Sequence, residues 1–158
     1  MKVWYDTEFI EDGRTIDLVS IGMVREDGHE YYAVSTEFDS GKADDWVRDN
    51  VLAHLPPEPH GAYVDRATMR DEILDFTGTD KPEFWAYYAD YDWVVLAQLF
   101  GRMIDLPSGY PMYCKDLKQW CDALGNPELP AHDEAEHHAL ADARWNRKAY
   151  EFLQQYDI

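Results

Sequence analysis

The first 36 residues alternate between apolar and polar positions in the way typical of β-strands. Residues 3–9 and 15–24 are rich in β-branched and aromatic residues, and the turn signal Asp12-Gly13 separates them. A second turn signal, which ends at Gly28, leads into a third such run at residues 29–36. The pattern predicts three strands in an antiparallel meander.

The remainder of the chain predicts helices and one further strand. The aromatic and apolar run at residues 82–89 has the length of a strand and passes directly into a helix expected to begin near Asp90. Apolar residues recur at helical spacing in four other segments, and a polar linker precedes the last of them. The segments are residues 46–52, 66–76, 117–124 and 138–156, and the linker is 128–136. This order predicts an α/β fold, a mixed sheet with helices on both faces, in a single domain spanning residues 1–158.

Composition limits the kind of protein this can be. The hydrophobic fraction of 46% and aromatic fraction of 15% are those of a packed globular chain. No apolar run approaches the roughly 20 residues of a membrane span, so we expect a soluble cytoplasmic protein. The net charge of -18 argues against an extended basic surface for nucleic acid. Most of the 32 acidic residues are expected to be solvated surface, and any phosphate group must be bound locally.

The two cysteines do not predict a disulfide. Cys114 and Cys121 lie seven residues apart in a stretch that we interpret as helical, which places them two turns apart on one face. We expect core-facing thiols in a reducing compartment.

Two acidic residues end the first predicted strand. Asp6 and Glu8 are two residues apart, so both side chains point to the same face of the sheet. Such a pair is usually solvent-facing. The flanking residues are apolar, however, and paired anions beside an apolar lining are costly unless a cation neutralises them.

A third acidic candidate lies where the later strand becomes a helix. The carboxyl end of a strand is where α/β proteins tend to bind ligands, and Asp90 and Asp92 both fall at this junction. Either could instead cap the helix. We expect Asp90 to cap and Asp92 to point into the cleft.

The last predicted helix begins with a histidine and an aspartate. His137 and Asp142 are five residues apart, a poor spacing for one helical face. Both reach one site only if His137 lies in the preceding loop and Asp142 on the second turn. His138 is interpreted as an N-cap neighbour or a surface histidine.

Together these residues suit phosphoryl-transfer chemistry. Carboxylate ligands without cysteine favour Mg²⁺ or Mn²⁺ over zinc. Two such ions about 4 Å apart stabilise the entering and departing oxygens of an in-line displacement, while a nearby imidazole removes a proton from the attacking water. A site that binds phosphate through metals does not require a basic protein.

Three motifs in the chain resemble those of the DEDDh family of 3′-to-5′ exonucleases. They are DTE at residues 6–8, YADYD at 88–92 and HHALADA at 137–143. The second departs from the His-Asn-x-x-Phe-Asp of many relatives. The resemblance implies the ribonuclease H-like fold, in which parallel strands extend the antiparallel meander. It also implies that two ions are held by Asp6, Glu8, Asp92 and Asp142, with His137 as general base.

The sequences of two longer segments are similar to those of the ribonuclease AS group of actinobacterial exoribonucleases. These are YDTEFIEDGRTIDLVSIGMV and YYAVSTEFD, near the N-terminus. The resemblance implies release of mononucleotides from the 3′ end of single-stranded RNA, a preference for poly(A), and a two-fold homodimer.

Substrate contacts and competing functions remain open on the residues alone. Phe9 and Thr7 are the candidate substrate-binding residues, with Phe9 able to stack on a terminal base, although core packing is the commoner role for an aromatic residue. The same five site residues suit a DNA-directed proofreading or repair exonuclease. A catalytically silent nucleic-acid-binding module and an acidic adaptor that recruits basic partners are the non-enzymatic alternatives.

Overall fold

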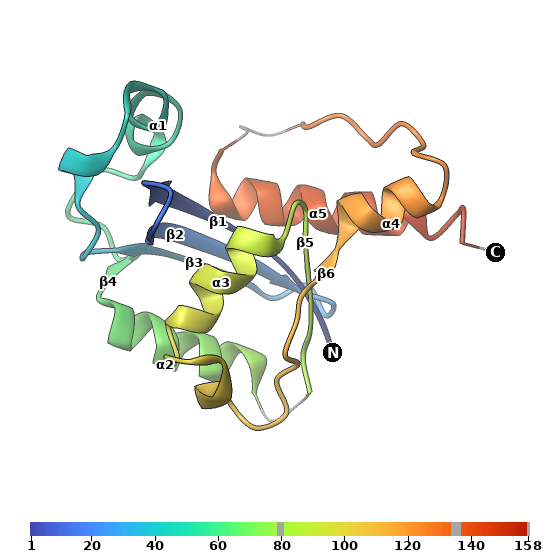
Figure 1. Cartoon of the computed structure of the whole chain (residues 1–158), viewed down its shortest axis with the longest axis horizontal. Coiled ribbons are helices and arrows are strands. Elements are labelled where there is room, and N and C mark those ends of the chain that lie inside the picture. Colours follow the sequence, from blue (N-terminus) through green and yellow to red (C-terminus); the bar gives the residue numbers. More distant parts are fainter. Residues whose placement is uncertain (79–80, 134–136, 158) are drawn as a thin grey trace.

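A six-stranded mixed sheet forms the centre of the molecule (Figure 1). The computed structural model describes residues 1–78, 81–133 and 137–157. The strand order is β4-β3-β2-β1-β5-β6. The strands are β1 (Lys2–Glu11), β2 (Ile16–Arg25), β3 (Glu30–Ser35), β4 (Tyr63–Val64), β5 (Glu83–Ala86) and β6 (Lys115–Asp116).

The first three strands form the predicted antiparallel meander. β5 pairs with β1 in parallel, β6 with β5 in parallel, and β4 with β3 in parallel. The α/β prediction is therefore confirmed. β4 and β6 were not expected, because two residues are too few to show the period-2 pattern of a strand.

Helices cover both faces of the sheet, as predicted (Figure 1). α2 and α3 pack on one face, where they bury Val3 and Tyr5 of β1. α4 and α5 pack on the other face against Trp4. The helices are α1 (Asp45–Asn50), α2 (Arg66–Thr77), α3 (Asp90–Gln98), α4 (Leu117–Ala123) and α5 (Ala139–Leu153), with 3₁₀ turns at Ser40–Lys42, Leu52–His54 and Met103–Asp105.

The amino-terminal end of α5 comes unusually close to the sheet at Gly22 of β2. A Cβ atom on Gly22 would lie 2.4 Å from the backbone N and Cα of Leu140 and 2.5 Å from the carbonyl carbon of Ala139. Gly22 is also the residue that pairs with Asp6 across the β1–β2 ladder. The absence of a side chain there lets the start of α5 lie directly over the strand that carries Asp6.

The interpretation of the cysteines needs one correction. Cys114 lies just before β6 rather than in a helix, and only Cys121 is helical, in α4. The reason is that residues 111–116 pass alongside β5, where Cys114 Sγ contacts the Phe84 carbonyl at 3.4 Å. Both thiols are free, as expected.

The predicted polar linker at residues 128–136 carries no helix or strand where it is described, and residues 134–136 lie outside the described part of the chain. Among the described residues, no helix combines the length and the apolar character needed to cross a membrane.

Candidate active site

A pocket of about 480 Å³ opens at the carboxyl end of β1. Its walls come from β1, the segment around α1, the β5–α3 junction and the start of α5, which are far apart in the sequence. All seven residues proposed from the sequence line it, namely Asp6, Thr7, Glu8, Phe9, Asp92, His137 and Asp142.

Asp6 and Glu8 approach the pocket from the face of β1 that carries Trp4, the face that α5 covers. A register shift follows Glu8 and interrupts the regular alternation there. One oxygen of Asp6, Oδ2, is buried and has no hydrogen-bond donor within the described residues. Burial raises the pKa of Asp6 well above its usual value, and the negative charges of Asp92 and Glu8 raise it further.

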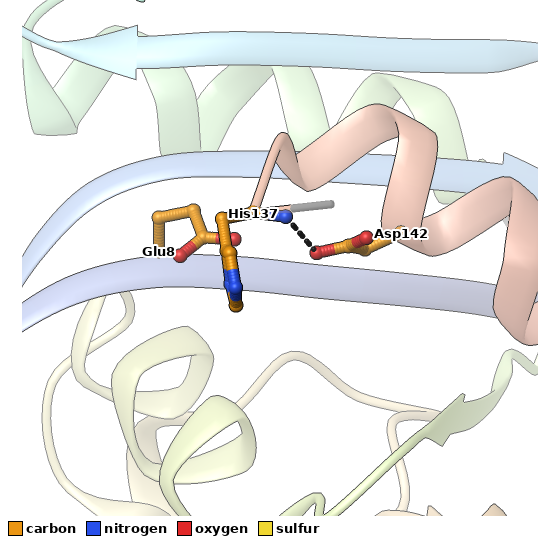
Figure 2. A group of neighbouring side chains, drawn as sticks. All are labelled: Glu8, His137 and Asp142. Carbon is orange, nitrogen blue, oxygen red and sulfur yellow. Dashed lines mark hydrogen bonds between the residues drawn. The ribbon is translucent and has the colours of Figure 1, made fainter. Parts of the chain in front are cut away.

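Glu8, His137 and Asp142 lie close enough together in the pocket to hold one metal ion (Figure 2). One potential ligand atom from each lies within 4.8 Å of the others. Figure 2 shows His137 between Glu8 of β1 and Asp142 of α5, with the His137 backbone N–H donating to Asp142 Oδ2 at 3.0 Å. Burial, followed by the charge of Asp142, raises the pKa of Glu8 to about 8.

His137 lies in the turn that precedes α5, with a positive φ of 63°. A non-glycine residue in this region is strained, and such strain is frequent at functional sites. Asp142 lies in the first turn of α5, not in the second turn where we expected it, because the helix begins at Ala139. His138 is the N-cap, and its imidazole accepts from the Ala141 N–H at 3.4 Å.

Asp92 reaches the pocket from α3, on the other face of the sheet. Its side chain is buried, with the residue 5% exposed. The backbone N–H of Thr7 donates to Asp92 Oδ1 at 3.0 Å, and the Thr7 hydroxyl donates to the same oxygen. Burial raises the pKa of Asp92 to about 6, against the lowering effect of these two donors.

The expectation that Asp90 caps α3 is wrong. The N-cap is Ala89, which has no side chain able to cap, and Asp90 is exposed. Asp116 of β6 instead accepts from the backbone N–H groups of Tyr88 and Ala89 at 3.1 and 3.4 Å. Because Asp116 supplies the capping carboxylate, Asp92 is not needed as a cap and its side chain is directed to the pocket.

The two candidate substrate residues differ in how far they are available. Thr7 is only 4% exposed and its hydroxyl is committed to Asp92. Phe9 is half-buried, packs against the core and meets Tyr91 with ring centroids 6.0 Å apart. Both line the pocket, but the Thr7 hydroxyl is already bound to Asp92 and the Phe9 ring is half-buried.

Three lining residues were not singled out from the sequence. Trp46 of α1 is 52% exposed, and its ring meets the His137 ring edge-on at 4.9 Å. Tyr88 is 65% exposed and has a positive φ of 53°. Lys42 is the one lysine or arginine among the described residues of the wall. Only the scarcity of basic residues could have drawn attention to Lys42.

The donor set fits divalent cations. Carboxylate oxygens suit Mg²⁺ or Mn²⁺. The buried Asp6 Oδ2 accepts no hydrogen bond from the described residues, and a cation would satisfy it. Burial is the largest cause of the raised pKa values of Asp6, Glu8 and Asp92, and repulsion from neighbouring carboxylates adds to it. Bound cations would offset both effects.

A ribonuclease H-like mixed sheet with clustered carboxylates at the end of its first strand, joined by a histidine just before the last helix and an aspartate in it, is typical of a class of 3′-to-5′ exonucleases. Residues 1–154 match the 3′-5′ exoribonuclease Rv2179c-like domain. The chain belongs to that family, and the family predicted from the motifs is confirmed.

Two curated relatives are each 45% identical to this chain over 160 residues, and the comparison covers 99% of this chain and 95% of theirs. They are the 3′-5′ exoribonucleases Rv2179c and MT2234.1 of Mycobacterium tuberculosis, from strains ATCC 25618 / H37Rv and CDC 1551 / Oshkosh.

Among solved structures the chain is similar to exonuclease I. One such structure has a TM-score of 0.67 at 17% identity, covering 99% of this chain and 42% of its own. The zinc-ion-bound form of Escherichia coli exonuclease I in complex with single-stranded DNA has a TM-score of 0.69 at 17% identity, covering 98% and 40%. This chain thus spans about two fifths of the exonuclease I chains, and the likeness concerns the fold.

Proposed function

We propose that this protein removes nucleoside monophosphates one at a time from the 3′ end of single-stranded RNA, with two divalent metal ions and His137 as general base. The observation that carries the proposal is the convergence of Asp6, Glu8, Asp92, His137 and Asp142 on one pocket. Membership of a family described as 3′-5′ exoribonucleases supports the choice of RNA and of the 3′ end.

The carboxylates of Asp6, Glu8, Asp92 and Asp142 would hold two Mg²⁺ or Mn²⁺ ions, which supply positive charge to the entering and departing oxygens. His137 removes a proton from the attacking water through its imidazole. The water oxygen forms the new bond to phosphorus while the bond to the 3′ oxygen of the penultimate nucleotide breaks. The products are a nucleoside 5′-monophosphate and a strand with a new 3′-hydroxyl.

His137 is suited to this role by the way it is fixed. Its backbone N–H is bound to Asp142, which holds the turn, and its ring meets Trp46 edge-on beside Glu8. A general base must be held within hydrogen-bond reach of the water it deprotonates. The backbone bond and the ring contact support this role.

Exposed rings rather than basic residues are proposed to hold the terminal nucleotide. Trp46 and Tyr88 present open ring area to the pocket, whereas Phe9 is half-buried, so we assign base stacking chiefly to these two. Lys42 lines the same pocket, and we propose that it meets a substrate phosphate. We retain Phe9 and Thr7 as proposed minor contacts to the substrate, with Thr7 acting mainly on Asp92.

A preference for poly(A) and a two-fold homodimer are proposed from the resemblance to the ribonuclease AS group. Adenine presents a donor amino group where guanine presents an acceptor, so a selective pocket needs a well-placed acceptor. A hydrogen bond to the terminal 2′-hydroxyl would distinguish RNA from DNA.

The test compares initial rates on oligo(A), oligo(C), oligo(U) and oligo(dA) of equal length, at one salt concentration because phosphate binding depends on salt. We expect stepwise shortening from the 3′ end that stops after chelation and in Asp6→Asn, with the fastest rate on oligo(A). Equal rates on the three RNAs would remove the adenine preference alone. A faster rate on oligo(dA) would move the assignment to a DNA-directed exonuclease, and full activity after chelation would refute the metal mechanism.

A further inference from the structure

A second histidine, His132, lies against Asp142. Its Nδ1 is 3.7 Å from Asp142 Oδ1, whereas the other carboxylate oxygen, Oδ2, accepts from the His137 backbone N–H. His132 belongs to the polar linker, and the three exonuclease motifs do not include it. Each oxygen of Asp142 therefore faces a histidine from the segment that precedes α5.

The position of His132 is determined by α5 itself. The imidazole stacks on the Trp145 ring, with centroids 4.4 Å apart and planes 10° from parallel. Trp145 is buried, and its indole N–H donates to the Pro130 carbonyl at 2.8 Å. On the far side of His132, the Asp133 carboxylate accepts from Lys148 at 3.1 Å. The linker is therefore attached to the helix on both sides of the histidine.

The spacing along α5 explains why these contacts act together. Asp142, Trp145 and Lys148 are three residues apart, so they lie along one stripe of the helix. Residues 130–133 run beside this stripe. The stack leaves the imidazole edge, with Nδ1, directed at Asp142 and removes most of the rotational freedom that an exposed histidine would have.

We propose that His132 is a positioning residue that orients the Asp142 carboxylate for a divalent cation by donating from Nδ1 to Oδ1. The proposal rests on the proposed function, because it takes Asp142 as a metal ligand. The 3.7 Å separation is a few tenths of an ångström beyond a hydrogen bond, so a small rotation of either side chain completes the contact. A cavity of about 130 Å³ lined by His132, Asp6, Asp142 and Asn146 leaves room for that rotation.

Groups that orient a metal ligand have a measurable effect on the affinity for the metal. Loss of such a partner typically costs 10–100-fold in metal affinity. His132 has no place in the hydrolysis of bound RNA, because His137 takes the proton. The expected signature is therefore weaker cation binding with an unchanged KM for RNA at saturating metal.

The experiment measures the Mn²⁺ dissociation constant of the RNA-free protein by calorimetry for three variants. His132→Phe keeps a flat ring on Trp145 and removes the donor, so we expect at least about 10-fold weaker Mn²⁺ binding. His132→Asn carries an amide donor near the place of Nδ1 without the full stack, so it should bind Mn²⁺ more tightly than His132→Phe. Asp142→Asn is the reference for loss of the ligand itself.

The outcomes separate the two proposals. Unchanged Mn²⁺ affinity in Asp142→Asn would refute the metal site and with it the proposed function. Loss of affinity in Asp142→Asn together with normal affinity in His132→Phe would overturn only the positioning role. Equal losses in His132→Phe and His132→Asn would also overturn it, since the donor would then not matter. Melting temperatures in chelator show whether each variant remains folded.

Discussion

The close approach of α5 to Gly22 gives the sharpest prediction about how the site is assembled. A Cβ added by Gly22→Ala would lie 2.4 Å from the Leu140 backbone, whereas ordinary contacts begin at 3.4 Å. The start of α5 must therefore retreat by about 1 Å, and His137 and Asp142 move with it. Overpacking of this kind costs about 1–3 kcal/mol of stability.

In free energy, the effect on turnover should be comparable with the effect on folding. A misplacement of about 1 Å at a catalytic group costs on the order of 10²-fold in rate. Gly22 pairs with Asp6, so the displacement opens the distance between Asp6 on β1 and Asp142 on α5. We expect Gly22→Ala to remain folded and to lose roughly 10²-fold in kcat on an RNA oligonucleotide with Mn²⁺.

The matched control is Gly61→Ala, because a Cβ on Gly61 has no atom within 4 Å among the described residues. It should leave both kcat and melting temperature unchanged. Adding Leu140→Ala to Gly22→Ala should not rescue activity, since the clash is with backbone atoms. Wild-type kcat in folded Gly22→Ala, or rescue by Leu140→Ala, would refute the reasoning.

Three further predictions concern single side chains. His137→Ala should lower kcat by roughly 10²-fold or more, whereas His138→Ala removes an N-cap and should lower the melting temperature with little change in kcat; the reverse result would reassign the base. In chelator, the raised pKa of Glu8 makes the free energy of unfolding of the metal-free protein depend on pH. The stability is fully present below about pH 4.5 and is lost as the pH rises to about 8. Glu8→Gln should therefore raise the melting temperature of the metal-free protein at pH 8 but not at pH 4.5, and the carboxylate penalty at pH 7 is on the order of 3 kcal/mol; an identical pH profile in both proteins would contradict this. Thr7→Val removes the hydroxyl that donates to Asp92 and should weaken Mn²⁺ binding by about 10-fold, while Thr7→Ser, which keeps the hydroxyl, should not; equal binding by both would assign Thr7 a packing role.

Local patterns in the sequence determined most of the secondary structure. The meander, the strand that leads into α3 and the helical segments were all predictable, because alternation and helical spacing report which face of an element is apolar. The same rule placed Asp6 and Glu8 on one face of β1. The motifs identified the family, because residues that carry a particular chemistry recur at fixed spacings in short sequence motifs.

Contacts between distant segments required the tertiary structure. The sequence favoured Asp90 as the cap of α3, but Asp116 of β6 accepts from the backbone N–H groups of the turn before that helix instead. The approach of Asp142 to Asp6 depends on the absence of a side chain at Gly22. Such distances are set by packing between elements, which local periodicity does not describe.

Exposure was also decided only in three dimensions. Trp46 has the spacing of a core residue, but α1 lies beyond the end of β1 and leaves its ring half open beside His137. His132 belongs to a linker without periodicity, and only its stack on Trp145 brings it to Asp142. An aromatic or histidine side chain is buried, exposed or functional according to what packs against it, and the packing partners of Trp46 and His132 lie elsewhere in the chain.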